Sequence, residues 1–220
     1  MNRIQQLHID LLATRNIIFL GVVVFMIALI NFIIQHTFLN EQLLFNTYGD
    51  RIGYDRLKTI FSRWQSQQWL YLAFIPVSFL LKVGFTTLCV TIGAFYFTDT
   101  TSFSSNWNIC LKVQYIYLLM IVVTFGDLML LKEVNTVNDL SFIPFSFTQL
   151  LKSDHLPNWA KYPLQTVNVW ELLYCLAGSY LFKLHYQVSY KRALTLFSVS
   201  YLIGLFFWVI VVVFLTVQFS

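Results

Sequence analysis

Three charged side chains, Lys82, Asp127 and Glu171, stand inside long apolar runs of this sequence. Placing a charge in hydrocarbon costs at least about 2.5–3.5 kcal/mol on membrane-insertion scales. One cation and two carboxylates offset that cost if they pair or if they line a polar pocket. These three residues therefore form the candidate intramembrane polar cluster.

Three arrangements of the cluster are compatible with the sequence. In the simplest, Lys82 extends its long stem to the interface, and Asp127 and Glu171 reach interfacial water. In the second, the lysine forms a structural ion pair with the carboxylates. In the third, the residues line a functional pocket that opens to the outside. Glu171 also fits a place near a helix N-terminus, where the helix dipole stabilises negative charge.

Other reactive constellations are absent from the sequence. It has no Gly-x-Ser-x-Gly, no His-Glu-x-x-His, no phosphate loop and no Cys/His zinc spacing. The three cysteines lie inside or beside apolar runs and are interpreted as small buried hydrophobes. We therefore expect no catalytic, cofactor-binding or metal-binding residues, and predict that the protein is not an enzyme.

Long apolar segments must position the cluster. Hydrophobic residues make up 58% of the 220 residues and charged residues 11%, whereas soluble domains have roughly 45–50% and about 25%. A bilayer core about 30 Å thick needs about 20 apolar residues in a helix, and five runs qualify. The predicted fold is an all-α, polytopic transmembrane bundle in a single integral membrane domain, residues 1–220, with spans at about residues 17–35, 75–97, 112–131, 167–184 and 192–219.

The first two spans need further definition. The first apolar run exceeds the 7–15 residues of a signal-peptide core and has no small-x-small cleavage site after it, so we expect it to remain as an anchor. Pro76 sets the start of the second span, because a proline inside a helix removes a hydrogen bond and promotes a kink. Residues 69–74 are then an interfacial lead-in.

Two long loops, about residues 36–68 and 132–166, are predicted to carry interfacial helices. From Tyr54 to Trp64, apolar residues recur at helical spacing with basic residues between them, which indicates an amphipathic helix in the membrane interface. The run from Phe142 to Leu151 is too short to span and is broken by Pro144. We interpret it as an interfacial or re-entrant piece.

The basic residues predict the orientation in the membrane. Lys191 and Arg192 lie in the short connection between the last two spans, which places that connection in the cytoplasm. The C-terminus is then outside and the N-terminus, with Arg3 and Arg15, is cytoplasmic. In this orientation all three members of the cluster lie in the outer third of the membrane.

Small residues in the last two spans favour close helix packing. We expect these contacts to lie within one chain rather than between copies. The residues concerned are Ala177, Gly178, Ser179, Ser200 and Gly204.

Two segments carry a family resemblance: TDTTSFSSNWNICLKVQYIYLLMIV, and NVWELLYCLAGSYLFKLHYQVSYKRALTLFSVSYLIGLFFWV. Over about residues 70–219 the chain resembles the bacterial branch of the Yip-type membrane proteins. Phe103 matches the family's Phe-rich turn before the third span, and Lys191, Arg192 and Ala193 match its basic turn before the last span. Eukaryotic relatives bind small GTPases through a long N-terminal region. Only about 16 residues precede the first span here, so GTPase binding is not carried over.

Many spans without a reactive constellation favour a non-enzymatic scaffold or accessory subunit of a membrane complex. The alternative is a small transporter or permease subunit that uses the cluster as an outer-leaflet polar pocket. The expected partners are the lipid bilayer and either another membrane protein or a second copy of the chain. Nucleic acid is not expected, because the net charge of +4 is scattered rather than gathered into a basic stripe. The expected location is the bacterial inner membrane, and no cofactor is expected.

Overall fold

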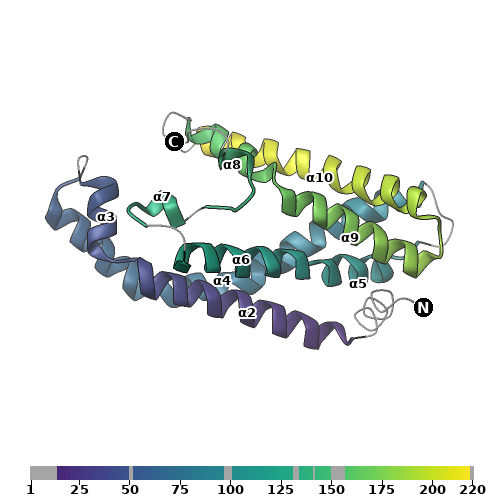
Figure 1. The fold of residues 1–220 in the computed structure, drawn as a ribbon, viewed down its shortest axis with the longest axis horizontal. Helices are drawn as coiled ribbons and strands as arrows, with labels where there is room; N and C mark the ends of the chain where they lie inside the picture. The colour runs from purple at the N-terminus through teal and green to yellow at the C-terminus, as the bar shows by residue number, and fades with distance from the viewer. Residues whose placement is uncertain are drawn as a thin grey trace. The chain divides into compact units, whose positions relative to one another are not determined.

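The computed structural model describes residues 14–49, 52–96, 101–130, 134–140, 142–149 and 157–218. In these ranges every regular element is helical, apart from an isolated bridge between Ser146 and Asn168. The predicted all-α fold is confirmed. The described α-helices, labelled in Figure 1, are α2 (Asn16–Phe38), α3 (Glu41–Tyr48), α4 (Tyr54–Phe95), α5 (Phe103–Val113), α6 (Tyr115–Leu130), α7 (Val137–Leu140), α8 (Asn158–Thr166), α9 (Val169–Tyr186) and α10 (Tyr190–Gln218). A short 3₁₀ helix, η1 (Phe147–Gln149), precedes α8.

Within the described residues, four helical segments are long and apolar enough to cross a membrane: Asn16–Phe38, Tyr54–Phe95, Phe103–Leu130 and Tyr190–Gln218. They contain most of the first, second, third and fifth predicted spans. Helix α9 covers the fourth predicted span, but it has 18 residues, about 27 Å at about 1.5 Å per residue. It also carries acidic and basic side chains at its two ends. Its 18 residues are therefore less apolar than the most apolar stretch of 18 residues in each of the other four segments.

Helix α4 begins earlier than the predicted second span. The expected interfacial helix at residues 54–64 continues without a break into the span, and Pro76 lies inside the helix. A proline removes one backbone donor, while the neighbouring turns keep their hydrogen bonds. The 42 residues extend about 63 Å, roughly twice the hydrocarbon thickness, so part of α4 must lie outside the hydrocarbon if the helix crosses a membrane.

The third predicted span is interrupted at Gln114, between α5 and α6. The Gln114 N–H donates to the Leu111 carbonyl at 3.2 Å, and the Tyr117 N–H donates to the Gln114 carbonyl at 3.1 Å. Such three-residue spacing defines a short 3₁₀ turn within an otherwise α-helical segment. Gln114 is only 1% exposed. The irregular turn is thus covered by protein, which is the condition under which such backbone is tolerated inside a membrane.

The contacts within the chain define two compact units. For the described residues, the first unit combines parts of Met1–Gly21, Leu80–Tyr117 and Phe145–Ser220. The second unit combines Val22–Phe79 with parts of Leu118–Pro144. Helices α5, α8, α9 and α10 belong to the first unit, whereas α3 and α7 belong to the second.

Small residues allow α10 to approach α4 closely in the first unit. A Cβ added to Gly93 would lie 1.7 Å from Ser200 Oγ, and a Cβ added to Gly204 would lie 2.6 Å from Cys89 Sγ. Real Cβ atoms do not tolerate such distances, so the two helices cross where one of them lacks a side chain. The expectation that Ser200 and Gly204 serve packing within one chain is confirmed.

Helices α9 and α10 lie side by side in the same unit (Figure 1). A Cβ added to Gly178 would lie 2.2 Å from the Phe197 ring, so this glycine accommodates the ring. The predicted packing role of Gly178 within the chain is therefore confirmed as well.

The second long loop is not helical over the described part of its apolar run, residues 142–149, apart from η1. The rest of that run lies outside the described residues. The Phe147 N–H donates to the Val167 carbonyl at 2.9 Å, and the Val169 N–H donates to the Phe145 carbonyl at 3.2 Å. These bonds fasten the loop to the beginning of α9.

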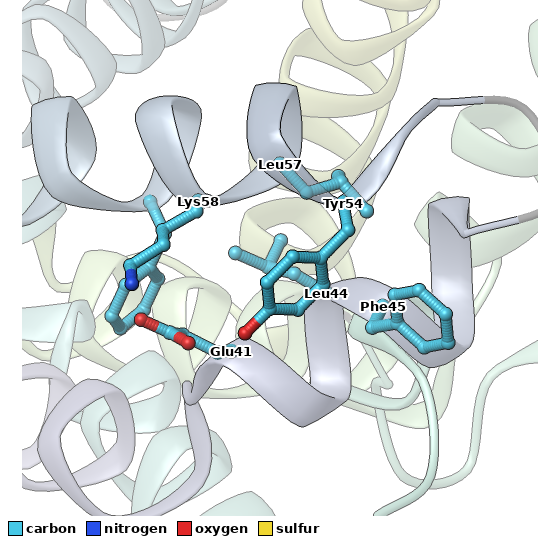
Figure 2. Close-up of a pocket in the computed structure, with 7 residues that line it drawn as sticks. Glu41, Leu44, Phe45, Tyr54, Leu57 and Lys58 are labelled. Carbon is cyan, nitrogen blue, oxygen red and sulfur yellow. The ribbon is translucent and has the colours of Figure 1, made fainter.

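In the second unit, α3 packs against α7. The Val137 N–H donates to Thr47 Oγ1 at 2.9 Å. A small pocket lies between α3 and the beginning of α4, and in Figure 2 the ends of Glu41 and Lys58 point toward one another at its edge. Its lining residues are Glu41, Leu44, Phe45, Tyr54, Leu57, Lys58 and Phe61.

Candidate functional site

Lys82 and Glu171 meet around Tyr117 in the first unit. The Lys82 Nζ lies 3.2 Å from the centroid of the Tyr117 ring, which is a cation–π contact. The Tyr117 hydroxyl donates to Glu171 Oε2 at 2.7 Å. The two charged groups, both in the described part of the chain, form no direct ion pair. The tyrosine therefore connects the cation to the carboxylate.

Helix α9 fixes the position of Glu171. Asn168 is the N-cap of α9, and its Oδ1 accepts the Glu171 N–H at 2.9 Å. Glu171 therefore lies in the first turn, where the helix dipole favours a negative charge. Its side chain is half-buried. The alternative placement near a helix N-terminus thus describes Glu171 correctly, in addition to its contact with Tyr117.

Three oxygen atoms form a triangle at the centre of the site. Tyr201 on α10 also donates to Glu171 Oε2, and the Tyr117 and Tyr201 hydroxyl oxygens are 2.8 Å apart. Hydrogen bonds to a charged group contribute about 1.5–3 kcal/mol each, more than neutral ones. Among the described residues, the other carboxylate oxygen, Glu171 Oε1, has no hydrogen-bond partner.

Three tyrosine rings surround this triangle, and we call Tyr117, Tyr174 and Tyr201 the tyrosine cage. The ring centroid of Tyr174 lies 5.0 Å from that of Tyr117 and 4.7 Å from that of Tyr201. All three rings are buried, Tyr174 completely. Gln114, at the 3₁₀ turn, donates from Nε2 to the Tyr174 hydroxyl at 3.4 Å. The cage is thus formed from α6, α9 and α10.

The Lys82 side chain lies differently from an extended interfacial lysine. As a whole the side chain is exposed, yet its ammonium group rests on the face of a buried ring. The hydrocarbon stem therefore accounts for the exposure, while the charged end is directed toward the tyrosine cage. This geometry favours pairing through Tyr117 over simple extension of Lys82 to the interface.

The third residue of the predicted cluster, Asp127, lies on α6 after Tyr117, in the second unit, and its side chain is half-buried. The structure thus brings together two of the three residues of the predicted cluster, Lys82 and Glu171.

Two tyrosines that complete the site, Tyr117 and Tyr201, were not predicted from the sequence. Tyr117 and Tyr201 lie within apolar runs, where a tyrosine contributes mainly apolar surface. The available signal was the hydroxyl, because a buried tyrosine hydroxyl generally needs a hydrogen-bond partner. A tyrosine hydroxyl of this kind is therefore a candidate hydrogen-bond donor to an intramembrane carboxylate such as that of Glu171.

Lys112, which was predicted only as the beginning of a span, is a buried cation. It is 0% exposed, and its Nζ donates to the Thr14 carbonyl at 2.7 Å. The same nitrogen lies 4.5 Å from the centroid of the Phe19 ring. Lys112 therefore joins α5 to the beginning of α2.

Helix α8 packs against α10, the helix that carries Tyr201. Trp208 Nε1 on α10 donates to the Tyr162 hydroxyl at 2.9 Å. Burial raises the pKa of Tyr162 above its ordinary value, although the bond from Trp208 acts in the opposite direction. Tyr162 thus remains a neutral hydroxyl group at neutral pH.

Within the described residues, no group of three or more His, Cys, Asp or Glu side chains is arranged to hold a metal ion. The chemistry that the site offers is cation binding by aromatic faces and hydrogen bonding to a carboxylate. No protein-family model matches the chain, and neither curated proteins nor solved structures give a match.

Proposed function

We propose that the protein is a non-enzymatic polytopic membrane protein that acts as a scaffold or accessory subunit of a larger membrane complex. The observation that carries this proposal is that the polar groups of the site bind one another. Glu171 Oε2 accepts two tyrosine hydroxyls, and Lys82 rests on the ring of Tyr117. A network of this kind holds α4, α6, α9 and α10 at fixed rotations, as expected of a rigid support.

The outer faces of the helices support a role in assembly. Helix α2 buries only Val23 and Ile30 among its side chains. The buried residues of α10 all lie between Ala193 and Gly204, so its C-terminal half is an apolar surface with exposed phenylalanines. Lipid covers such faces, and a helix of a membrane partner can replace lipid there. The partner would be another membrane protein or a second copy of this chain.

As part of the proposal, α9 is the fourth of five spans. It packs against α5 and α10, which belong to candidate spans, and it buries Trp170, Tyr174 and Ser179 among its neighbours. A span surrounded by protein needs less hydrophobicity than one surrounded by lipid. The five-span topology has a cytoplasmic N-terminus in a bacterial inner membrane, and it agrees with the resemblance to bacterial Yip-type proteins.

The topology can be tested with single cysteines placed at Ser189 and Ser220 in a background without native cysteines. An impermeant thiol reagent applied to intact cells should label the cysteine at 220 and not the cysteine at 189, because α10 separates the two positions. Lysed cells provide the control, in which both cysteines should react. Equal labelling of both in intact cells would contradict the topology.

The scaffold role can be tested by gentle purification of the full chain followed by mass spectrometry of the proteins that travel with it. We expect a membrane protein at fixed stoichiometry, or a defined oligomer of the chain itself. The control is the variant Gly204→Leu, which forces a side chain against Cys89. This variant should release the partner, because it disturbs the contact of α10 with α4. A stable, partner-free monomer at native expression level would contradict the scaffold role.

A second candidate, a small transporter or permease subunit, has one observation in its favour. Glu171 is half-buried, and its Oε1 has no partner among the described residues, so this oxygen is available to a solute. A bound solute in the purified monomer, lost in Glu171→Gln, would favour transport over the scaffold role.

A further inference from the structure

We propose that the tyrosine cage and Glu171 form a binding site for a primary ammonium ion, and that the side chain of Lys82 is its built-in occupant. The inference concerns the chemistry of the site and does not depend on the scaffold role. Its ligand class is a small primary alkylammonium ion. Three features of the structure lead to it.

The first feature is the surface that the cation contacts. Aromatic faces bind ammonium ions within about 6 Å of the ring centroid, and the Lys82 Nζ lies well within this limit, at 3.2 Å from the Tyr117 centroid. The Tyr117 hydroxyl donates to a carboxylate, which makes its ring more electron-rich and strengthens its attraction for a cation. The Glu171 carboxylate lies beyond the ring and supplies the balancing charge.

The second feature is how the cation is held. In an ordinary structural ion pair the ammonium group donates directly to the carboxylate, whereas the Lys82 ammonium group is held by a ring face. Glu171 Oε2 is already occupied by Tyr117 and Tyr201. The hydrogen bonds that these two hydroxyls donate to Glu171 fix the rings of Tyr117 and Tyr201 independently of the lysine. The cage is therefore formed by groups other than its occupant.

The third feature is access. The Lys82 stem is exposed while its ammonium group contacts a buried ring, so the side chain reaches the Tyr117 ring of the cage from the surface. Replacing Lys82 by alanine would vacate the path of the stem together with the ammonium position. The atoms lost beyond Cβ are three carbons and one nitrogen, which are the heavy atoms of propylammonium. This ion should follow the same path and occupy the same place.

The proposal can be tested on the full chain in detergent with the variant Lys82→Ala. We expect this variant to melt at a lower temperature than the parent, and propylammonium chloride to restore at least half of the difference. The parent should not respond to propylammonium, because Lys82 occupies its site. Sodium chloride at equal ionic strength, and 1-propanol at equal concentration, should not restore the melting temperature. Equal restoration by 1-propanol would show that the compound only fills an apolar cavity, without need of a charge. This outcome would overturn the proposal, and so would no restoration by either compound.

The matched control is Lys183→Ala. Lys183 also lies near an aromatic ring, but its Nζ is 5.9 Å from the centroid of Tyr180. At this distance the ammonium group lies at the outer limit of a cation–π contact. The variant should melt close to the parent and should not respond to propylammonium.

A measurement on the parent protein keeps the proposal testable if Lys82→Ala does not fold. In NMR spectra of the chain with 13C-labelled lysine ε-carbons, the ring current of Tyr117 should shift the Lys82 ε-protons upfield. Lys82→Arg identifies the signal, and Tyr117→Leu should remove the shift. An ε-proton signal of Lys82 at the position of solvent-exposed lysines would overturn the proposal.

Discussion

Replacing Lys82 by methionine should destabilise the folded protein by about 2 kcal/mol, the magnitude of a desolvated cation–π contact and less than the roughly 3–5 kcal/mol for breaking a direct buried ion pair. Methionine fills the space of the lysine stem. The loss of stability therefore measures the contribution of the ammonium group rather than the effect of a cavity. The reason for the lower figure is that Glu171 keeps its two tyrosine donors and is only half-buried. A thermal or chemical melt in detergent measures the effect.

The double variant Lys82→Met with Glu171→Gln should recover much of this loss, because no uncompensated charge remains. The control is Lys82→Met with Asp127→Asn. Asp127 lies in the other unit, so removing its charge should not restore stability. A Lys82→Met variant that melts with the parent would show that the ammonium group contributes nothing. Equal recovery by both double variants would show that Asp127 acts together with the other two residues.

Replacing Gly93 by alanine should destabilise the protein by about 1–3 kcal/mol, the usual cost of overpacking a well-packed contact. The new methyl group would lie 1.7 Å from Ser200 Oγ and 2.7 Å from Ser200 Cβ, so α4 and α10 would have to separate. Adding Ser200→Gly should restore stability, since the nearest remaining atom, the Cα of residue 200, is 3.8 Å away. Thermal melts of the parent and the two variants in one detergent provide the comparison.

The matched control is Gly126→Ala on α6, where an added Cβ meets no atom within 4 Å. Alanine favours a helix over glycine by about 1 kcal/mol, so this variant should be as stable as the parent or slightly more so. If Gly93→Ala behaves like the control, the close approach of α4 and α10 is not a feature of the folded protein.

The apolar runs predicted where the helices lie along the chain. The first and last predicted spans, 17–35 and 192–219, agree within a few residues with Asn16–Phe38 and Tyr190–Gln218. Run length suffices there because each run is bounded by polar residues. The beginning of α4 was predicted less well, because Pro76 was taken as a boundary. A proline removes one hydrogen bond, and the helix on both sides of it is long enough to continue.

The candidate site was only partly predictable, for a different reason. Counting residues along a span gives the depth of a side chain, but not the direction in which it points. Lys82, Asp127 and Glu171 were selected by the cost of a buried charge, which is the same for all three. Only packing distinguishes them: Lys82 and Glu171 contact Tyr117, whereas Asp127 lies in the other unit. Tyr201 carries no charge and therefore gave no comparable signal.

The short 3₁₀ turn at Gln114 sets the rotational phase of Tyr117. Each residue advances about 100° around an α-helix and about 120° around a 3₁₀ helix, so the turn gives Tyr117 an orientation that an unbroken α-helix would not give it. One residue inserted or deleted between Gln114 and Tyr117 would rotate the ring by about 100°, away from Lys82 and Glu171. The hydropathy of the segment would hardly change. In this stretch the spacing of residues therefore carries information that their apolar character does not.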